Sequence, residues 1–250
     1  MVRKRKKNMS TCKKTPEAPH ENAVREAARR ALLPPWLAAV LAMAYVAAVL
    51  MIDTLAVHRV DLGIQWRAFL WHTAGGFDLF KLIGWLVVPF LLCLYGFDWG
   101  ALGVARWKRV DWILLAALAG VELLAVLAIP LIPALQNVYQ GMGDAPADVK
   151  WHFATGNLAF LCSWLLGWEF MHRYFLLRHV EKWLPRWGWL MVPLCEGLYH
   201  LQKPLLEAGG MVLFSVVVTL WVRRRKNILL PLLAHLTICL LYTSPSPRDR

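Results

Sequence analysis

Long runs of apolar residues with almost no charge dominate the hydropathy pattern of this chain. Residues 36–51, 82–97 and 112–135 are the clearest of these runs. Each comes close to the roughly 20 residues that cross a hydrocarbon core of about 30 Å. A water-soluble domain would alternate more clearly between apolar and polar positions, so the pattern predicts membrane-spanning helices.

Seven such helices fit the pattern, with short polar or basic connections between them. The predicted spans cover residues 36–57, 80–97, 112–132, 157–178, 189–200, 207–222 and 228–242. Between them we predict a loop with an interfacial helix over residues 58–79 and a polar loop over residues 136–153. The expected fold class is therefore all-α, a polytopic transmembrane helical bundle of about seven spans.

The chain has a net charge of +12, and the positions of its basic residues indicate its orientation. Ten of its 28 Lys and Arg residues lie in the first 30 positions, and many others gather in the connections 106–109, 178–186 and 223–226. With a cytoplasmic N-terminus, alternation of the seven spans places these connections on the cytoplasmic side, where Lys and Arg are enriched. We therefore expect a multi-pass protein of the cell (inner) membrane. Its partner is the lipid bilayer, and we expect no nucleic-acid partner.

The sequence is expected to divide into four parts. Residues 1–33 form a basic cytoplasmic arm, residues 34–154 the N-terminal transmembrane spans, and residues 155–243 a second transmembrane region with the candidate catalytic residues. Residues 244–250 have no apolar periodicity, and we interpret them as a non-native tail that resembles translated read-through of an incomplete gene. Whether the residues are native is an open question from about Cys239 onward.

The segment GWEFMHRYFLLRH places several ionisable residues inside a predicted span. A charged side chain at the centre of a bilayer costs about 2.5–3.5 kcal/mol on insertion scales, so such residues usually face the protein interior. Counted at about 1.5 Å per residue from the nearest cytoplasmic connection, Glu169 lies roughly 15 Å deep, His200 roughly 18 Å and His235 roughly 12 Å. Similar depths on three helices predict one buried polar site.

Glu169 and Arg173 are four residues apart and share a helix face, so they can pair. The pair is either structural, locking its helix to the neighbours, or catalytic, with Arg173 orienting Glu169 as a base. Glu196 adds another ionisable residue within a span. His172 falls on a different face from Arg173, and we assign it to the membrane interface or to packing.

One carboxylate and two imidazoles are sufficient to hydrolyse an amide. A carboxylate and a histidine can hold and deprotonate a water molecule, and a second histidine can donate to the oxyanion. Glu169, His200 and His235 are also candidate metal ligands, because two histidines and a glutamate form a common catalytic zinc set. The HExxH motif does not occur in the sequence. Two cofactor alternatives therefore stay open, a divalent metal such as zinc and no metal.

Three segments, EFMHRYFLLR, LYHLQKP and ILLPLLAHL, resemble the CAAX prenyl protease and bacteriocin-processing (CPBP, or Abi) family of intramembrane proteases. The resemblance covers about residues 155–240. The family has the motifs EExxxR and FxxxH, and a third histidine followed four residues later by Asn. The resemblance implies a helical membrane protease in which Glu169, Arg173, His200 and His235 are catalytic.

The sequence departs from the family motifs at three positions. Trp168 replaces the first Glu, which in the family is generally assigned as the base; Glu196 replaces Phe, and Cys239 replaces Asn. The chain is similar to a bacterial branch of the family with W-E-F-x-x-R and H-x-x-K-P-x-x-E motifs, which implies Lys203 and Glu207 as supporting residues. Glu207 either supplies the missing carboxylate or forms an interfacial ion pair with Lys203.

The resemblance implies an intramembrane endopeptidase that hydrolyses a peptide bond with water activated by glutamate and histidine. Its expected substrate is a peptide or a membrane protein. The alternative is a non-catalytic membrane protein for bacteriocin immunity or partner binding, which the loss of the first Glu favours. A transporter is a third hypothesis, but its acidic residues would be spread along a path rather than gathered at one depth.

Overall fold

The computed structural model describes residues 33–57, 73–74, 77–94, 97–133 and 146–241. The chain divides into two compact units, Met1–Pro34 and Pro35–Arg250, and the elements described below all belong to the second. Apart from Leu33, the predicted basic arm lies outside the described residues, as does the predicted tail.

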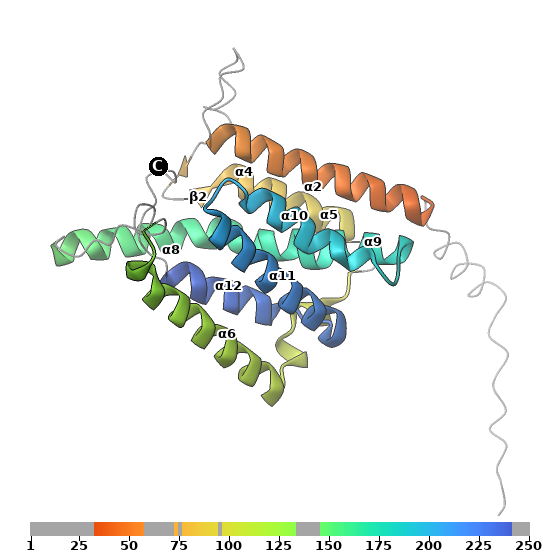
Figure 1. Ribbon diagram of the computed structural model, residues 1–250. Coiled ribbons are helices and arrows are strands. Elements are labelled where there is room, and N and C mark those ends of the chain that lie inside the picture. The colour runs from red at the N-terminus through yellow and green to blue at the C-terminus, as the bar shows by residue number, and fades with distance from the viewer. Residues whose placement is uncertain (1–32, 58–72, 75–76, 95–96, 134–145, 242–250) are drawn as a thin grey trace, which may run out of the picture. The chain divides into compact units, whose positions relative to one another are not determined.

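Helices make up almost all of the described part of the chain (Figure 1). The first elements are α2 (Pro35–Val57), the strands β1 (Thr73–Ala74) and β2 (Phe77–Asp78), α4 (Leu79–Lys81), the π-helical η1 (Leu82–Val87), α5 (Val88–Cys93), the 3₁₀ turns η2 (Trp99–Leu102) and η3 (Val104–Arg106), α6 (Arg109–Ala128) and the 3₁₀ turn η4 (Ile129–Leu131). The two strands form one short antiparallel pair, with Thr73 opposite Asp78. The all-α fold class is confirmed.

A nearly continuous helical rod opens the second half of the bundle. It consists of α8 (Ala147–Phe170), the π-helical η5 (Met171–Leu176) and α9 (Leu177–Trp183). The elements that follow are the 3₁₀ turn η6 (Gly188–Leu190), α10 (Met191–His200), α11 (Leu205–Arg225) and α12 (Leu229–Leu241).

Three helices of the described residues are long and apolar enough to cross a membrane. They cover Pro35–Leu55, Arg109–Leu131 and Leu205–Arg225, and two shorter apolar helices cover Leu79–Cys93 and Leu229–Leu240. Many large apolar side chains on these helices are exposed, as expected for surfaces that contact lipid. The chain is therefore a membrane protein, while the count of seven spans stays a prediction.

The structure corrects the boundary predicted for the polar loop over residues 136–153. Helix α8 begins at Ala147, because Pro146 takes an extended conformation at the N-cap and Asp148 lies in the first turn, where a negative charge is favourable. The helix that contains the fourth predicted span therefore begins ten residues before residue 157. Of the segment predicted as a loop with an interfacial helix, residues 58–72 lie outside the described part.

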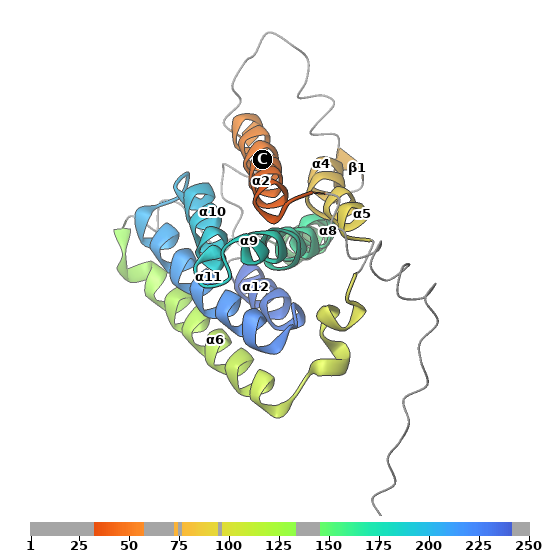
Figure 2. The ribbon, with the colours of Figure 1, turned by 90° about the vertical axis from the view of Figure 1, so that its right-hand side faces the viewer.

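The rod α8–η5–α9 lies in the middle of the bundle. In Figures 1 and 2, α2 runs on one side of it and α12 on the other, and α6 packs on the outer side of α12. Every side chain from Gly167 to Leu177 is buried. The rod therefore presents its central turns to protein on all sides.

Gly167 allows a close approach of another helix to this rod. A Cβ atom at this position would lie 3.0 Å from Cβ of Trp85 and 3.1 Å from the backbone nitrogen of Leu86, both in η1. The close approach sets the Trp85 ring 5.3 Å from the Trp168 ring. The absence of a side chain at Gly167 thus lets the Trp85 and Trp168 rings pack together on one side of the candidate site.

Candidate functional site

The polar centre of the bundle begins with the pair expected from the four-residue spacing of Glu169 and Arg173. Nη1 of Arg173 donates to Oε2 of Glu169 at 2.5 Å, and both side chains are fully buried. Glu169 lies in the last turn of α8 and Arg173 lies in η5, so the pair spans the junction between an α-helical and a π-helical segment. Single π-helical turns within α-helices are frequent at functional sites.

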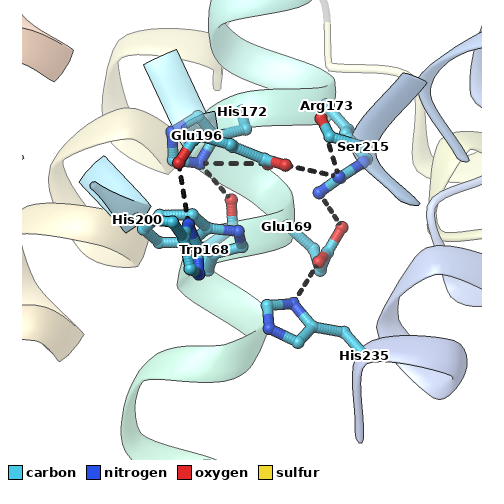
Figure 3. Close-up of polar contacts among 8 residues, drawn as sticks. All are labelled: Trp168, Glu169, His172, Arg173, Glu196, His200, Ser215 and His235. Carbon is cyan, nitrogen blue, oxygen red and sulfur yellow. Dashed lines mark hydrogen bonds and ion pairs between the residues drawn. The ribbon is translucent and has the colours of Figure 1, made fainter. Parts of the chain in front are cut away.

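His235 of α12 is the second side chain that contacts the Glu169 carboxylate. Its Nδ1 lies 2.7 Å from Oε1 of Glu169 (Figure 3). A carboxylate only accepts hydrogen bonds, so the imidazole carries a proton on Nδ1. Both oxygens of Glu169 are consequently engaged, one by the guanidinium and the other by the imidazole.

Arg173 also binds a second buried carboxylate. Its Nη2 donates to Oε2 of Glu196 at 2.8 Å and lies 3.5 Å from the Ser215 hydroxyl. Glu196 belongs to α10 and is fully buried. Its carboxylate therefore joins that of Glu169 at the same guanidinium.

The interpretation of His172 as an interfacial or packing residue misses its polar contacts. Its Nδ1 lies 3.0 Å from the carbonyl oxygen of Trp168 and 3.7 Å from Oε1 of Glu196. The interpretation assumed that only one face of the helix looks inward. Because η5 is surrounded by protein, His172 and Arg173 on different faces both enter the polar cluster (Figure 3).

The Trp168 indole lies among three imidazoles. Its ring centroid is 4.3 Å from that of His172, 5.8 Å from that of His200 and 6.4 Å from that of His235. Nδ1 of His200 lies 2.7 Å from the carbonyl oxygen of Glu196, which places that imidazole proton on Nδ1 as well. Of the predicted catalytic set, His200 and His235 thus lie beside the Trp168 ring, and Glu169 contacts both Arg173 and His235.

Lys203 and Glu207 lie at the junction between α10 and α11. Their side chains form an ion pair of 3.0 Å, with Lys203 40% exposed and Glu207 13% exposed. The sequence left two alternatives for Glu207, a replacement for the missing carboxylate or an ion pair with Lys203. The contact observed in the structure is the ion pair. A supporting role for both residues stays an expectation.

Two buried carboxyl groups inside predicted spans were missed by the sequence analysis. Asp53 in α2 accepts a hydrogen bond of 2.5 Å from the Tyr199 hydroxyl and lies 3.6 Å from Nζ of Lys81. Glu122 in α6 is 4% exposed. The signal that identified Glu169, an ionisable residue within an apolar run, was present at both positions and would have found them.

The three candidate metal ligands do not form a ligand set in this arrangement. Both oxygens of Glu169 are already engaged, and the Trp168 ring lies close to both His200 and His235. Within the described ranges, no three His, Cys, Asp or Glu side chains are placed to hold a metal ion. We therefore derive no chemical step through a metal.

Comparison with known proteins agrees with the family resemblance. Residues 152–241 match the family of the type II CAAX prenyl endopeptidase, Rce1-like. No curated protein and no solved structure matches the chain. The match covers the α8–α12 region that holds the polar cluster, and it supports membership of the CAAX prenyl protease and bacteriocin-processing family.

Proposed function

We propose that the chain is an intramembrane endopeptidase that hydrolyses a peptide bond with water activated by glutamate and histidine. Its family points to CAAX-type intramembrane protease activity. The observation that carries the proposal is the contact of 2.7 Å between the His235 imidazole and a Glu169 carboxylate fixed by Arg173. A carboxylate behind an imidazole is the arrangement that makes histidine an oriented general base.

Glu169 acts through His235 in this proposal. Because both its oxygens are engaged, it holds the imidazole with the proton on Nδ1 rather than binding the water itself. Nε2 of His235 then accepts a proton from the attacking water. Arg173 is a positioning residue, since it contacts the carboxylate and not the reacting atoms.

His200 shares the base role, because its Nδ1 proton is likewise engaged and its Nε2 carries the lone pair. Once an imidazole has taken up the proton from water, its Nε2–H becomes a donor. It can then bind the oxyanion or protonate the departing amine, and general acid–base catalysis of this kind contributes about 10²–10⁴-fold in rate.

The proposed orientation has a cytoplasmic N-terminus in the cell (inner) membrane. The three basic connections support it because they contact one another. Arg106 donates to the Lys226 carbonyl at 2.8 Å, Arg225 donates to the Arg106 carbonyl at 2.8 Å, and Arg223 pairs with Glu181. Connections that touch lie at the same end of the bundle, as the enrichment of cytoplasmic loops in Lys and Arg requires.

A comparison of peptide termini tests the proposal. Membranes that contain wild type or Glu169→Gln at matched levels are compared for newly formed N- and C-termini. We expect termini that form only with wild type, and a loss of at least about 10²-fold in the variant. These termini also identify the substrate, which we propose is a peptide or a membrane protein.

A second function is favoured by one observation, the Trp168 indole in place of the first family Glu. A non-catalytic role in bacteriocin immunity or partner binding would tolerate this replacement. If folded, inserted wild type produces no termini beyond those of Glu169→Gln, hydrolysis is refuted and the binding role replaces it.

A further inference from the structure

A surface cavity lies at the end of the bundle where the basic connections meet. Its volume is about 550 Å³, within the range of about 300–1,000 Å³ that ligand sites occupy. Its walls come from the end of α9, the turn that follows, and the end of α11, which lie at the same end of the bundle (Figure 1). The lining residues are Glu181, Pro185, Leu220, Arg223, Arg224 and Lys226.

The cavity has more cations than its carboxylate can neutralise. Glu181 is the acidic residue of the lining, and it is paired with Arg223. Arg223 also donates to the Pro185 carbonyl at 3.2 Å, which holds it in the wall. Arg224 and Lys226 are exposed and form no ion pair with a carboxylate in the described part of the chain. Two positive charges are thus left for a ligand, and guanidinium and ammonium groups are common partners of phosphate.

The backbone of Lys226 gives independent support for a binding role. Lys226 caps the C-terminus of α11 with φ 52° and ψ 48°, in the left-handed region. Among the described residues, no other non-glycine residue has a positive φ. Glycine is the preferred residue at such a cap, because a side chain in this region costs free energy. Strain of this kind gathers at ligand sites, so a lysine kept where the fold favours glycine indicates a function for its side chain.

Two general effects also favour basic residues at this place. Lys and Arg mark cytoplasmic loops, and they interact favourably with the C-terminal end of a helix dipole. Neither effect requires a cavity or a lysine in the left-handed conformation. The Lys226 amide donates to the Val222 carbonyl at 2.7 Å, and Arg106 donates to the Lys226 carbonyl at 2.8 Å. These backbone groups are therefore bonded without the side chains of Arg224 and Lys226.

An apolar stripe on α11 leads away from the cavity. Leu213, Val217 and Leu220 are 70%, 41% and 41% exposed. Their spacing of four and three residues, with Arg224 four residues further, places all four on one helix face. Leu213 and Arg224 lie 11 positions apart, or roughly 16 Å along the helix. Because half of a hydrocarbon core of about 30 Å is about 15 Å, the stripe matches the length of one acyl chain.

Tryptophans place the cavity at the level of lipid headgroups. Trp187 is 57% exposed, and the Arg186 guanidinium lies 5.2 Å from the centre of its ring. The Arg223 guanidinium lies 5.6 Å from the centre of the Trp189 ring. Tryptophan is enriched where a membrane meets water. A soluble phosphate compound would use the cations but not the apolar stripe, so the observations favour a lipid.

We propose that this cavity binds an anionic phospholipid. Its phosphate lies between Arg224 and Lys226, and one acyl chain follows Leu213, Val217 and Leu220. Basic pockets beside membrane-spanning helices are suited to such headgroups. With the proposed orientation, the lipid belongs to the cytoplasmic leaflet. The inference is independent of the peptidase function.

The experiment uses the full chain in detergent micelles. Binding of phosphatidylglycerol, zwitterionic phosphatidylcholine and glycerol 3-phosphate, a headgroup without acyl chains, is measured by native mass spectrometry. The variants are Arg224→Gln and Lys226→Gly. The matched control is Arg109→Gln, which removes an exposed positive charge at the start of α6, outside the cavity. The midpoint of thermal unfolding is measured for each protein without lipid.

We expect wild type to bind phosphatidylglycerol about 5-fold or more tightly than phosphatidylcholine. Each cavity variant should weaken binding of phosphatidylglycerol about 5-fold or more, the effect of one basic residue beside an anionic surface. The control should bind as wild type does. Lys226→Gly should unfold at a temperature equal to or above that of wild type, because glycine removes the left-handed strain. Weaker binding with undiminished stability supports the inference, since a capping role for the side chain would not give that combination.

Three results overturn the inference. Equal binding of phosphatidylglycerol and phosphatidylcholine would show that the charge of the headgroup is not recognised. A loss in Arg224→Gln no greater than in Arg109→Gln would assign binding to the overall charge of this end. Displacement of phosphatidylglycerol by an equal concentration of glycerol 3-phosphate would assign the cavity to a soluble phosphate compound.

Discussion

Replacement of Arg173 by Met is the most demanding test of the buried polar cluster. The guanidinium contacts Glu169 at 2.5 Å and Glu196 at 2.8 Å, and all three side chains are fully buried. Removing one partner of a buried ion pair costs about 3–5 kcal/mol, because the other charge is left uncompensated. Two carboxylates are left here, so we expect about 5 kcal/mol or more, which is comparable with the whole stability of many domains at about 5–15 kcal/mol.

This cost is large enough to measure as a change in thermal stability. At about 2–4 °C per kcal/mol, Arg173→Met should lower the unfolding midpoint in detergent micelles by roughly 10–20 °C or prevent accumulation of folded protein. The matched control is Arg223→Met. Its ion pair with Glu181 is partly exposed, so we expect a change of at most about 1 kcal/mol, or roughly 4 °C.

A triple variant separates lost charge balance from lost packing. Glu169→Gln, Arg173→Met and Glu196→Gln together remove every charge of the triad, and exchange of whole buried ion networks for neutral groups is often neutral or stabilising. We expect the triple variant to recover most of the midpoint that Arg173→Met loses. A triple variant no more stable than Arg173→Met, or an Arg173→Met variant as stable as wild type, would refute the electrostatic reasoning.

Two further predictions concern residues beside the cluster. Tyr199→Phe removes a hydrogen bond of 2.5 Å to buried Asp53, so it should cost about 1.5–3 kcal/mol in an unfolding measurement, whereas an unchanged midpoint would contradict this bond. Burial lowers the pKa of His179, which lies in α9 beyond the predicted span and whose Nδ1 proton is held by the Phe175 carbonyl at 2.7 Å. On acidification the imidazole gains a second proton, and the unfolded state binds that proton more readily than the folded state does. The contribution of His179 to the free energy of unfolding is therefore fully present above about pH 6.5 and declines as pH falls below it. His179→Gln should reduce the loss of stability on acidification below pH 6.5, and equal acid sensitivity of both proteins would contradict the assignment.

Much of the fold follows directly from the apolar runs. The runs predicted the helices, although not their ends, since Pro146 and Asp148 start α8 well before the apolar residues of the span begin. The pairing of Glu169 with Arg173 follows from their four-residue spacing. The convergence of Glu169 and His235 follows from their similar depth, because polar groups on different helices avoid lipid by facing one another.

Other parts of the site depend on tertiary packing, which cannot be inferred from the local sequence. The burial of His172 requires protein on every side of η5, which depends on packing by α2, α5 and α10. The contact between Glu196 and Arg173 joins two helices whose relative rotation is set by tertiary packing. Asp53 and Glu122 are different cases. Their sequence signal was present, but neither lies in a family motif.

The position of Trp168 has a consequence for the substitutions that the buried cluster can accept. The indole fills the space among three imidazoles, and a smaller carboxylate side chain would leave part of that space empty. Loss of a buried Trp costs about 3–5 kcal/mol, and the new charge would lie beside Glu169 and Glu196 with only one guanidinium to share. A carboxylate at this position therefore requires compensating changes in the neighbouring side chains, and Trp168→Glu alone is expected to destabilise the protein.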